Sequence, residues 1–277
     1  MADIRFDNKD FKKVFDLVHQ LTGIHLHDGK RELVSARLSK RMRALGHKSL
    51  GEYLSYVEEE ETQEELISML DALSTNLTSF WRESDHFDFL AEHVLPDWIK
   101  RTEKTGCRRY RLWSAGCSTG EEPYGLGILF YHHLQKIKGL DLKILATDLS
   151  TKVLGIAQAG WYEAQRVQTI PAEYLKTYFS KKTEDRRIVY RISPEIRKLI
   201  TFDRLNLMES WPMTGPFDII FCRNTMIYFT KQTQQHLINR FYDLLRSGGM
   251  LFVGHSESLA GTDHKFRYLR PTIYEKP

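Results

Sequence analysis

LWSAGCSTGEEPYGLG, residues 112 to 127, joins an apolar run to a glycine-bracketed turn, and the turn is followed by two carboxylates and a proline. The residues around Leu112 suit a β-strand. Gly116 and Gly120 permit backbone angles that are closed to other residues, and Pro123 fits the first turn of a helix. The stretch therefore predicts a strand, a tight loop and a helix start, a unit that can hold a nucleotide-like cofactor.

Charge narrows the choice of cofactor. Helix N-termini attract phosphates, but Glu121 and Glu122 place negative charge where a pyrophosphate would otherwise lie. The glycine spacing also differs from the G-x-G-x-x-G of dinucleotide folds and from the lysine-bearing P-loop. S-adenosylmethionine has no phosphates, and its sulfonium and ammonium groups can use nearby acids. The loop therefore favours a cationic cofactor of this kind.

A second acidic signal follows at Asp148, after the apolar run 142–147 that we expect to be a strand. An acid at a strand end commonly binds ribose hydroxyls. The separation from the glycine loop exceeds the roughly 20 residues of the dinucleotide fingerprint, because an extended helix near 122–136 intervenes. The alternative role for Asp148 is the N-cap of a helix over 152–159.

The composition predicts a globular protein with a packed core, since 42% of the 277 residues are hydrophobic and 12% are aromatic. No apolar run approaches the roughly 20 residues of a membrane span, and the charged N-terminal residues 1–13 show no export signal. We therefore expect a cytoplasmic protein.

Cysteine and histidine usage gives no metal signature. Cys107, Cys117 and Cys222 are widely spaced and lack a C-x-x-C pair, which argues against a disulfide framework and a structural zinc site. The close histidine pairs at 25/27 and 132/133 have no cysteine or acid at metal-ligand spacing. We expect no metal.

Basic residues concentrate between residues 28 and 46, where six cations face two acids, whereas the net charge of the whole chain is only +4. An apolar stripe that includes Val34 and Leu38 predicts an amphipathic helix with a cationic face. This helix is either an ordinary solvated surface helix or a docking site for an acidic partner. The candidate docking residues are Arg37, Lys40, Arg41 and Arg43.

The chain divides into three predicted parts. Residues 1–74 form a helical N-terminal domain, 75–91 a Ser/Thr-rich linker or a loop that faces the next part, and 92–277 a second, larger domain. Alternating strands and helices in the last part predict a mostly parallel sheet with helices on its faces. The expected strands are Tyr110 to Ser114, Leu142 to Thr147, Leu199 to Asp203, Phe217 to Cys222 and Met250 to Gly254.

An insert over 164–197 interrupts this alternation. It contains a helical piece around 172–179, a charged turn at 181–187 and a strand-like run at 188–192. The insert is either a small β subdomain for partner recognition or a decorated loop without a partner.

Five motifs together resemble one family, the CheR-type chemotaxis receptor methyltransferases, over almost the full chain. They are TNLTSFWRESDHF at 75–87, WSAGCSTGEEPY at 113–124, ILATDLS at 144–150, FDIIFCRNTMIYF at 217–229 and GGMLFVGHSESL at 248–259. The resemblance implies an α/β, class I S-adenosylmethionine-dependent methyltransferase, Rossmann-like with a mostly parallel sheet. It also implies an all-helical N-terminal domain and a small β subdomain inserted in the catalytic domain.

The resemblance implies transfer of the methyl group of S-adenosylmethionine to glutamate side chains of chemoreceptor cytoplasmic helices, which yields methyl esters and S-adenosylhomocysteine. Carried over by motif, the cofactor-binding residues are Asn76, Thr78, Arg82, Glu122, Asp148, Asn206, Leu207, Arg223 and Asn224. Arg82 and Tyr228 are the candidates for orienting the substrate carboxylate. On spacing alone Asn206 could equally be a turn residue, and Tyr228 could pack in the core with Phe229.

The implied partner is the acidic helical bundle of a chemoreceptor, and the enzyme is expected in the cytoplasm beside receptor arrays. No exposed heptad or symmetric motif requires a dimer, so a monomer is the default expectation. In some members of the family the inserted subdomain holds a receptor C-terminal peptide as a tether. The insert of this chain lacks the glycine of that loop, so we expect no tether. Two rival functions are a nucleic-acid methyltransferase, whose Asn/Asp-Pro-Pro-aromatic signature is missing here, and a catalytically silent signalling module.

Overall fold

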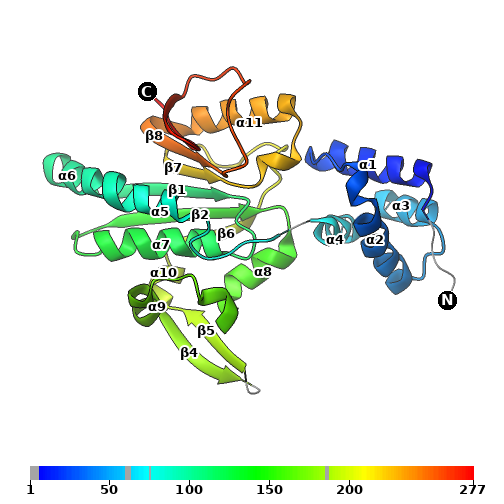
Figure 1. Cartoon of the computed structure of the whole chain (residues 1–277), viewed down its shortest axis with the longest axis horizontal. Coiled ribbons are helices and arrows are strands. Elements are labelled where there is room, and N and C mark those ends of the chain that lie inside the picture. The colour runs from blue at the N-terminus through cyan, green and yellow to red at the C-terminus, as the bar shows by residue number, and fades with distance from the viewer. Residues whose placement is uncertain (1–5, 60–63, 75, 185–186) are drawn as a thin grey trace.

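The computed structural model describes residues 6–59, 64–74, 76–184 and 187–277. A helical part and a larger part built on a sheet stand side by side in it (Figure 1). The helical part contains α1 (Asn8–Thr22), α2 (Arg31–Leu45), α3 (Leu50–Glu59) and α4 (Glu64–Leu73). Val14, Leu38, Tyr53 and Met69, one from each helix, are fully buried and form its core. The amphipathic spacing of the N-terminal sequence therefore produces a separate small core.

The larger part is organised around a seven-stranded sheet of order β6-β2-β1-β7-β8-β10-β9. Its strands are β1 (Arg109–Ala115), β2 (Asp141–Asp148), β6 (Ile200–Arg204), β7 (Phe217–Cys222), β8 (Leu245–Val253), β9 (Arg267–Arg270) and β10 (Ile273–Glu275). The first five strands in the order are parallel, and β10 runs antiparallel to both of its neighbours. The predicted mostly parallel sheet is confirmed, with β9 and β10 as strands that the sequence did not reveal.

Helices cover both faces of this sheet. Leu112 and Trp113, adjacent on β1, belong to two different buried clusters, as alternation along a strand requires. The cluster around Leu112 includes residues of α5 (Ser84–Phe89), α6 (Leu95–Thr105), α7 (Glu121–Leu134) and α8 (Thr151–Ala159), and that around Trp113 includes residues of α11 (Lys231–Leu244). Because β1, β2 and β7 are parallel, the chain segments that follow them emerge together at one end of the sheet, where the carboxyl ends of the strands lie.

The helical part is held against that edge by hydrogen bonds. His25 N donates to Tyr228 O at 2.7 Å, and Asn206 Nδ2 donates to Leu21 O at 2.7 Å. Near the N-terminus of α8, Thr151 Oγ1 donates to Asp71 Oδ2 at 2.9 Å. These contacts fix the position of the helical part beside the carboxyl ends of the strands.

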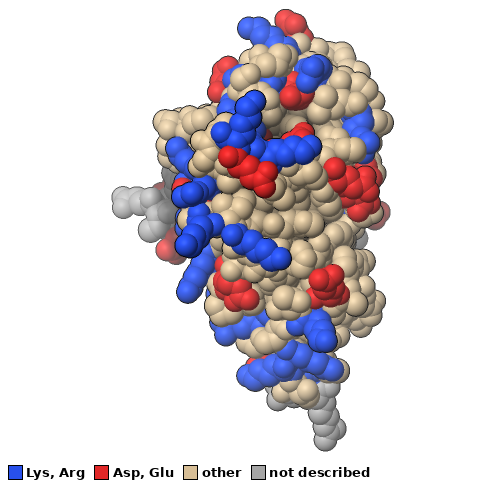
Figure 2. Space-filling model, turned by 90° about the vertical axis from the view of Figure 1, so that its left-hand side faces the viewer, with Lys and Arg blue, Asp and Glu red and all other residues tan. Residues whose placement is uncertain are grey.

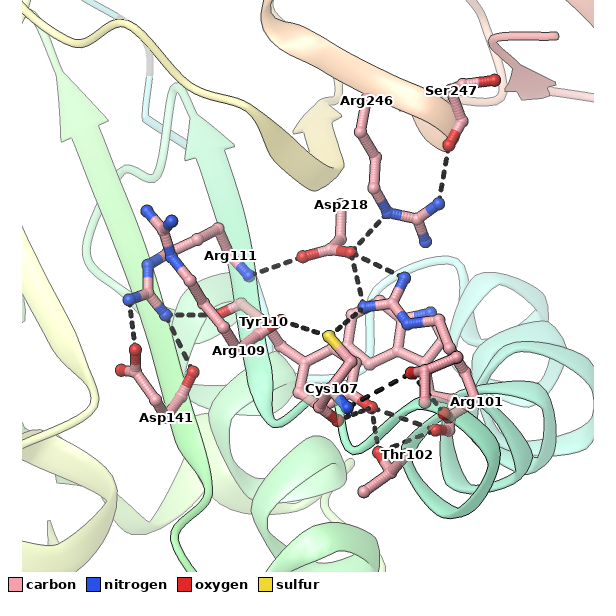
Figure 3. A network of polar contacts seen from close by, with 12 residues as sticks. Arg101, Thr102, Cys107, Arg109, Tyr110, Arg111, Asp141, Asp218, Arg246 and Ser247 are labelled. Carbon is pink, nitrogen blue, oxygen red and sulfur yellow. Dashed lines mark hydrogen bonds and ion pairs between the residues drawn. The ribbon is translucent and has the colours of Figure 1, made fainter.

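The opposite edge is tied together by the buried carboxylate of Asp218 on β7 (Figure 3). Arg246 Nε donates to Asp218 Oδ1 at 2.6 Å, and Arg101 Nη2 donates to the same oxygen at 3.2 Å. Arg111 N donates to Asp218 Oδ2 at 2.8 Å. One side chain therefore links α6, β1, β7 and β8 at the end of the sheet that lies away from the glycine loop.

Lysine and arginine side chains gather on the surface at this end of the sheet (Figure 2). Six exposed cations come from two connecting loops and their flanks: Lys104, Arg108, Arg109, Lys136, Lys138 and Lys143. Within the described residues none of the six forms an ion pair. The loops lie side by side because Asp141 N donates to Arg108 O at 2.9 Å. The sequence showed a basic surplus only at 28–46, since these cations are scattered along the chain.

The insert contributes β4 (Phe179–Glu184), β5 (Arg187–Ile192) and α9 (Ala172–Tyr178), and its strands form a second sheet of order β3-β5-β4 with β3 (Trp161–Glu163), which lies just before the insert. The predicted charged turn at 181–187 is wrong, because Lys181 to Glu184 belong to β4 and Arg187 belongs to β5. In an edge strand these charged side chains point to solvent while the backbone pairs with β5. Two insert residues, Asp185 and Arg186, and Thr75 of the first motif lie outside the described residues.

Candidate functional site

A cavity of about 430 Å³ lies where the helical part meets the carboxyl ends of the strands. It is lined by all ten residues that the sequence singled out for cofactor binding and catalysis: Asn76, Thr78, Arg82, Glu122, Asp148, Asn206, Leu207, Arg223, Asn224 and Tyr228. Tertiary structure therefore brings residues from five separate segments to one site.

The glycine loop after β1 closes one wall of the cavity. Gly116 and Gly120 have φ of 86° and 93°, which confirms the prediction of left-handed backbone here. A Cβ atom on Gly116 would lie 2.3 Å from Thr225 Oγ1, and one on Gly120 would lie 2.8 Å from the Cβ of Ala157. Glycine therefore allows the loop both to turn and to approach its neighbours closely.

Asp148 lies at the end of β2, as predicted. Its Oδ2 accepts a hydrogen bond from Ser118 N at 2.8 Å and its Oδ1 accepts one from Ser150 N at 3.0 Å. Ser150, and not Asp148, is the N-cap of α8, since the Ser150 side chain accepts from Val153 N. Burial raises the pKa of Asp148. Each carboxylate oxygen keeps a lone pair for a ligand hydroxyl.

Arg223 lies between two carboxylates and is only 2% exposed at its side chain. Its Nε is 3.3 Å from Glu83 Oε2 and 3.5 Å from Glu122 Oε2. Among the described residues its buried Nη1 has no hydrogen-bond partner. Ser114 Oγ donates to Glu122 Oε1 at 2.7 Å, while burial raises the pKa of Glu122. This corner of the cavity offers both an anionic acceptor and an unused cationic donor.

Two buried acids hold Asn224 in an uncommon backbone conformation, with φ of 54°. Glu257 Oε2 accepts from Asn224 N at 2.8 Å, and Glu83 Oε1 accepts from Asn224 Nδ2 at 3.2 Å. A left-handed asparagine persists where its surroundings fix it in this way. The absence of a side chain at Gly254 leaves room for the contact, since a Cβ there would lie 2.5 Å from Asn224 Nδ2.

Sequence reasoning missed Glu83 and Glu257 as site residues. Glu257 also accepts from Gly254 N at 2.6 Å and from Ile227 N at 3.1 Å, so one carboxylate organises the segment after β7. The positions of Glu83 and Glu257 in the sequence could have indicated this role, because each acid lies inside one of the five motifs that carry the family resemblance. Acids within otherwise apolar or small-residue motifs are candidates for such internal acceptor roles.

Asn206 lines the cavity, but its side chain is occupied. Its Nδ2 donates to Leu21 O and, at 3.1 Å, to Glu209 Oε1, and its Oδ1 accepts from Met208 N at 3.1 Å. These contacts are typical of a turn residue, the alternative role that the sequence left open for Asn206. The contact with Leu21 also links the two parts of the chain. Its neighbour Leu207 lines the cavity as well.

Arg82 and Tyr228 line the same cavity and are near enough for the charge of Arg82 to act on Tyr228. Arg82 Nη1 donates to Leu77 O at 2.8 Å, which fixes the guanidinium and leaves other N–H groups for a ligand. Burial raises the pKa of Tyr228, and the nearby positive charge of Arg82 opposes this rise. Phe229 is buried in the core, whereas Tyr228 is half-buried at the cavity, so the core-packing alternative applies to Phe229 alone.

The four cations proposed for docking on α2 have different environments. Arg41 forms a fork with Glu65, with Arg41 Nε to Glu65 Oε1 at 2.7 Å, and Arg37 Nη1 donates to Ser74 O at 2.9 Å. These two side chains stabilise the helical part itself. Lys40 and Arg43 are exposed, and Arg43 Nε donates to Ser39 O, a carbonyl of its own helix, at 3.1 Å.

Glu83, His86 and His255 bring metal-capable ligand atoms within 4.8 Å of one another, although His255 is far from the other two in sequence. A cation placed there would lie beside Arg223, whose Nε is already 3.3 Å from Glu83 Oε2. His255 Nε2 is 3.0 Å from Asp85 Oδ1, and burial lowers the pKa of His86 to about 4. The positive charge of Arg223 beside Glu83 would repel a cation bound there, which argues against a metal site.

Comparison with known families decides the identity of this fold and cavity. Residues 9–74 match the family model described as "CheR methyltransferase, all-alpha domain", and residues 76–274 match "CheR methyltransferase, SAM binding domain". The chain belongs to the CheR methyltransferase family. It is therefore an S-adenosylmethionine-dependent methyltransferase.

Relatives of this CheR-family chain cover nearly all of it. It is 39% identical over 259 residues to a probable chemotaxis protein methyltransferase of Rhizobium etli, covering 93% of this chain and 96% of the relative. It is 39% identical to the chemotaxis protein methyltransferase of Salmonella typhimurium, covering 95% and 88%. It is 38% identical to chemotaxis protein methyltransferase 2 of Pseudomonas aeruginosa, covering 98% and 94%.

The cavity of this CheR-family chain suits S-adenosylmethionine. Arg223 Nη1, which has no hydrogen-bond partner in the part of the chain that the structure describes, and the carboxylate of Glu122 complement the carboxylate and the ammonium of an amino acid. Asp148, at the strand end, can accept from ribose hydroxyls. Across the described residues no helix is long and apolar enough to cross a membrane.

Proposed function

We propose that this chain transfers the methyl group of S-adenosylmethionine to glutamate side-chain carboxylates on the cytoplasmic helices of chemoreceptors, forming glutamate methyl esters. The observation that carries the proposal is the single cavity that Arg82, Tyr228 and the cofactor-binding candidates line together. A carboxylate held by these two side chains would lie beside the bound methyl donor. The names of the relatives support a role in chemotaxis.

The proposed cofactor contacts follow the chemistry of each side chain. Asp148 accepts from the ribose hydroxyls, Glu122 receives the ammonium group, and Arg223 binds the carboxylate. Because the Asn206 side chain is engaged internally, we assign the adenine to the backbone and apolar surface of Asn206 and Leu207. The remaining polar wall is formed by Asn76, Thr78 and Asn224.

The reaction requires little acid–base chemistry from the protein. The bound cofactor supplies an electrophilic methyl group on a sulfonium. A glutamate side chain with a pKa of about 4.3 is already ionised at neutral pH, so no strong general base is needed. Arg82 orients the carboxylate through its planar fork and Tyr228 through one hydrogen bond, so positioning supplies most of the rate enhancement. The hydrogen bonds from Arg82 and Tyr228 must be of moderate strength, because overstabilising the carboxylate anion would reduce its nucleophilicity.

We further propose that α2 attracts the acidic receptor bundle through its exposed cations. Lys40 and Arg43 are free to meet a partner, whereas Arg37 and Arg41 already make internal hydrogen bonds. Attraction between exposed charges is weakened by salt, because the Debye length is only about 10 Å at 0.1 M ionic strength. Receptor methylation should therefore slow as salt rises, with the cofactor affinity changing less.

The decisive experiment measures transfer of radiolabelled methyl from S-adenosylmethionine to membranes that bear a chemoreceptor. Mild alkali should release the label as volatile methanol, since carboxyl methyl esters are alkali-labile. An Asp148→Asn variant, which loses an anionic acceptor at the cofactor site, is the matched negative control. Alkali-stable label would instead point to nitrogen or nucleic-acid substrates. Failure to bind S-adenosylhomocysteine would favour a catalytically silent module.

A further inference from the structure

The end of the sheet that lies away from the cofactor cavity carries an unbalanced positive charge. Six exposed cations lie there, from the end of α6, the loops that follow α6 and α7, and the first residues of β1 and β2. We call them the basic face: Lys104, Arg108, Arg109, Lys136, Lys138 and Lys143. Glu103 is an exposed acid beside Lys104. Figure 2 looks onto this end of the molecule, where blue side chains predominate over red ones. None of the six cations lines the cofactor cavity, so the proposed reaction does not use them.

Backbone pairing brings the basic face together from two stretches of the chain. Arg108 O accepts a hydrogen bond from Asp141 N at 2.9 Å, and Arg109 is the register partner of Asp141 in the parallel pair of β1 and β2. The Arg108 side chain reaches the loop before β2, since a Cβ atom on Gly139 would lie 3.5 Å from Arg108 Nη1. Lys138 adjoins Gly139 in that loop. The cations of both stretches therefore share one surface.

Other arginines already neutralise the acids beneath this surface (Figure 3). Arg111 Nη2 donates to Asp141 Oδ2 at 2.5 Å, and this hydrogen bond lowers the pKa of Asp141. The buried carboxylate of Asp218 accepts from Arg101 and Arg246. Because both acids have their own guanidinium partners, they do not cancel the charge of the basic face.

The basic face lacks the apolar groups of most specific binding sites. None of the large exposed apolar side chains of the described residues belongs to α6, β1, β2 or the loops that precede these strands. Single-stranded nucleic acids bind proteins by stacking their bases on aromatic side chains, and protein interfaces depend on buried aromatic or apolar anchors. A diffuse anionic surface needs neither. A bilayer with acidic lipids supplies a mobile phosphate beneath each scattered cation, so no matched geometry is required.

The basic face and the cofactor cavity lie at opposite ends of the parallel strands. β2 spans eight residues, so at about 3.3 Å per residue its two ends are about 25 Å apart. This separation exceeds twice the Debye length, which is about 10 Å at 0.1 M ionic strength, and charges on the basic face therefore have little effect on the cavity. A molecule that rests on a surface through the basic face points its cavity away from that surface.

We propose that the basic face binds the anionic lipid headgroups of the membrane that carries the receptor. Cations without an apolar anchor give weak, reversible binding, because stable membrane anchoring takes two signals. The receptor is the second signal, and the inference rests on the proposed function for the identity of this membrane. The contact keeps the enzyme near the receptors, with its cavity open to their cytoplasmic helices, and leaves it free to move between them.

The test measures binding of the whole chain at low salt to vesicles of two parts phosphatidylcholine and one part phosphatidylglycerol, by sedimentation. The face variant replaces four cations of the basic face: Lys104→Gln, Arg108→Gln, Lys136→Gln and Lys138→Gln. A control variant removes the same charge from exposed lysines elsewhere: Lys152→Gln, Lys181→Gln, Lys231→Gln and Lys265→Gln. A smaller face variant, Lys136→Gln with Lys138→Gln, changes only two loop residues and replaces the face variant if that protein does not fold.

Each basic residue near an anionic membrane strengthens binding about fivefold. We expect the face variant to bind these vesicles at least about fiftyfold more weakly than wild type, and the smaller variant about tenfold more weakly, because screening reduces the summed effect. The control variant should stay within about threefold of wild type, since charges farther than a Debye length from the bilayer are screened. Wild type should not bind pure phosphatidylcholine vesicles, and added salt should release it from the anionic ones. The Kd for S-adenosylhomocysteine should be the same in all variants.

Equal vesicle binding by wild type and the face variants would overturn the inference, as would equal binding of wild type to pure phosphatidylcholine and to the anionic vesicles. If Lys40→Gln with Arg43→Gln abolishes vesicle binding and the face variants do not, the membrane contact belongs to α2. Displacement of wild type from the vesicles by duplex DNA, at an equal concentration of phosphate groups, would assign the basic face to a nucleic acid and overturn the lipid assignment.

Vesicle binding and methyl transfer separate this inference from the proposed function, because the basic face lies outside the cavity. If wild type binds anionic vesicles more tightly than the face variant but no alkali-labile label reaches the receptor, the proposed function fails and the basic face stands. If the ester forms on a soluble cytoplasmic fragment of the receptor, and wild type and the face variant bind vesicles equally, the basic face fails and the proposed function stands.

Discussion

Replacing Arg41 by methionine tests whether this cation of α2 stabilises the fold or binds the receptor. The Arg41 guanidinium forms a fork with Glu65, whose side chain is only 6% exposed, and Tyr53 Oη donates to Glu65 Oε1 at 2.7 Å. The change removes the positive charge and leaves a buried carboxylate in the core of the helical part. Lys40→Met is the matched control, because Lys40 is the adjacent residue and is exposed.

Breaking a buried ion pair by removing one partner costs about 3–5 kcal/mol. Arg41 is 31% exposed at its side chain, and water can partly replace its contribution. We therefore expect Arg41→Met to lower the free energy of unfolding of the helical part by about 2–3 kcal/mol. Lys40→Met should change it by less than about 0.5 kcal/mol, as is usual for surface positions.

The assay is urea unfolding at 25 °C followed by circular dichroism, combined with receptor methylation at low salt under conditions where both variants are folded. Arg41→Met should lower the unfolding midpoint, and Lys40→Met should weaken receptor methylation without a change in stability. Equal stability of the two variants would refute the assignment of Arg41 to the core of the helical part. If Arg41→Met has wild-type stability but binds the receptor more weakly, Arg41 is a docking residue after all.

Further predictions concern the cavity. Glu257→Gln loses charge-assisted acceptors for three backbone N–H groups, so the Kd for S-adenosylhomocysteine measured by calorimetry should rise about tenfold or more; an unchanged Kd would show that the loop holds its shape unaided. Tyr228→Phe should lower kcat for receptor methylation more than it changes cofactor affinity, and equal turnover would remove Tyr228 from the mechanism. Gly116→Ala should abolish cofactor binding, because the new methyl would collide with Thr225; retained affinity would contradict this. Burial raises the pKa of Glu122 and of Asp148, so both acids lose their charge at a higher pH than ordinary carboxyls as the solution is acidified. Affinity for S-adenosylhomocysteine should then fall with decreasing pH before ordinary carboxyls protonate, and a flat calorimetric profile down to pH of about 4.3 would contradict the ligand roles of these acids.

Much of the fold was predictable because its signals are local. The glycine loop between Gly116 and Gly120 needs backbone angles that only particular residues adopt, and the strand pattern over 217–222 needs only neighbouring residues. Asp148 was found for the same reason, as an acid placed at the end of an apolar strand. The short strands β9 and β10 and the charged edge strand β4 were missed, since their sequences lack a clear apolar alternation.

By itself, the sequence determined the class of fold and, through five short motifs, the family and ten of the residues that line the cavity, because each motif is a pattern within a short segment. Only the tertiary structure decided how those residues are used. It paired Arg41 with the buried Glu65, clamped Asn224 between Glu83 and Glu257, and gathered scattered cations at the far end of the sheet. The physical reason is that hydrogen bonds and ion pairs act over a few ångströms in space, and the order of strands in the sheet sets which distant segments come that close.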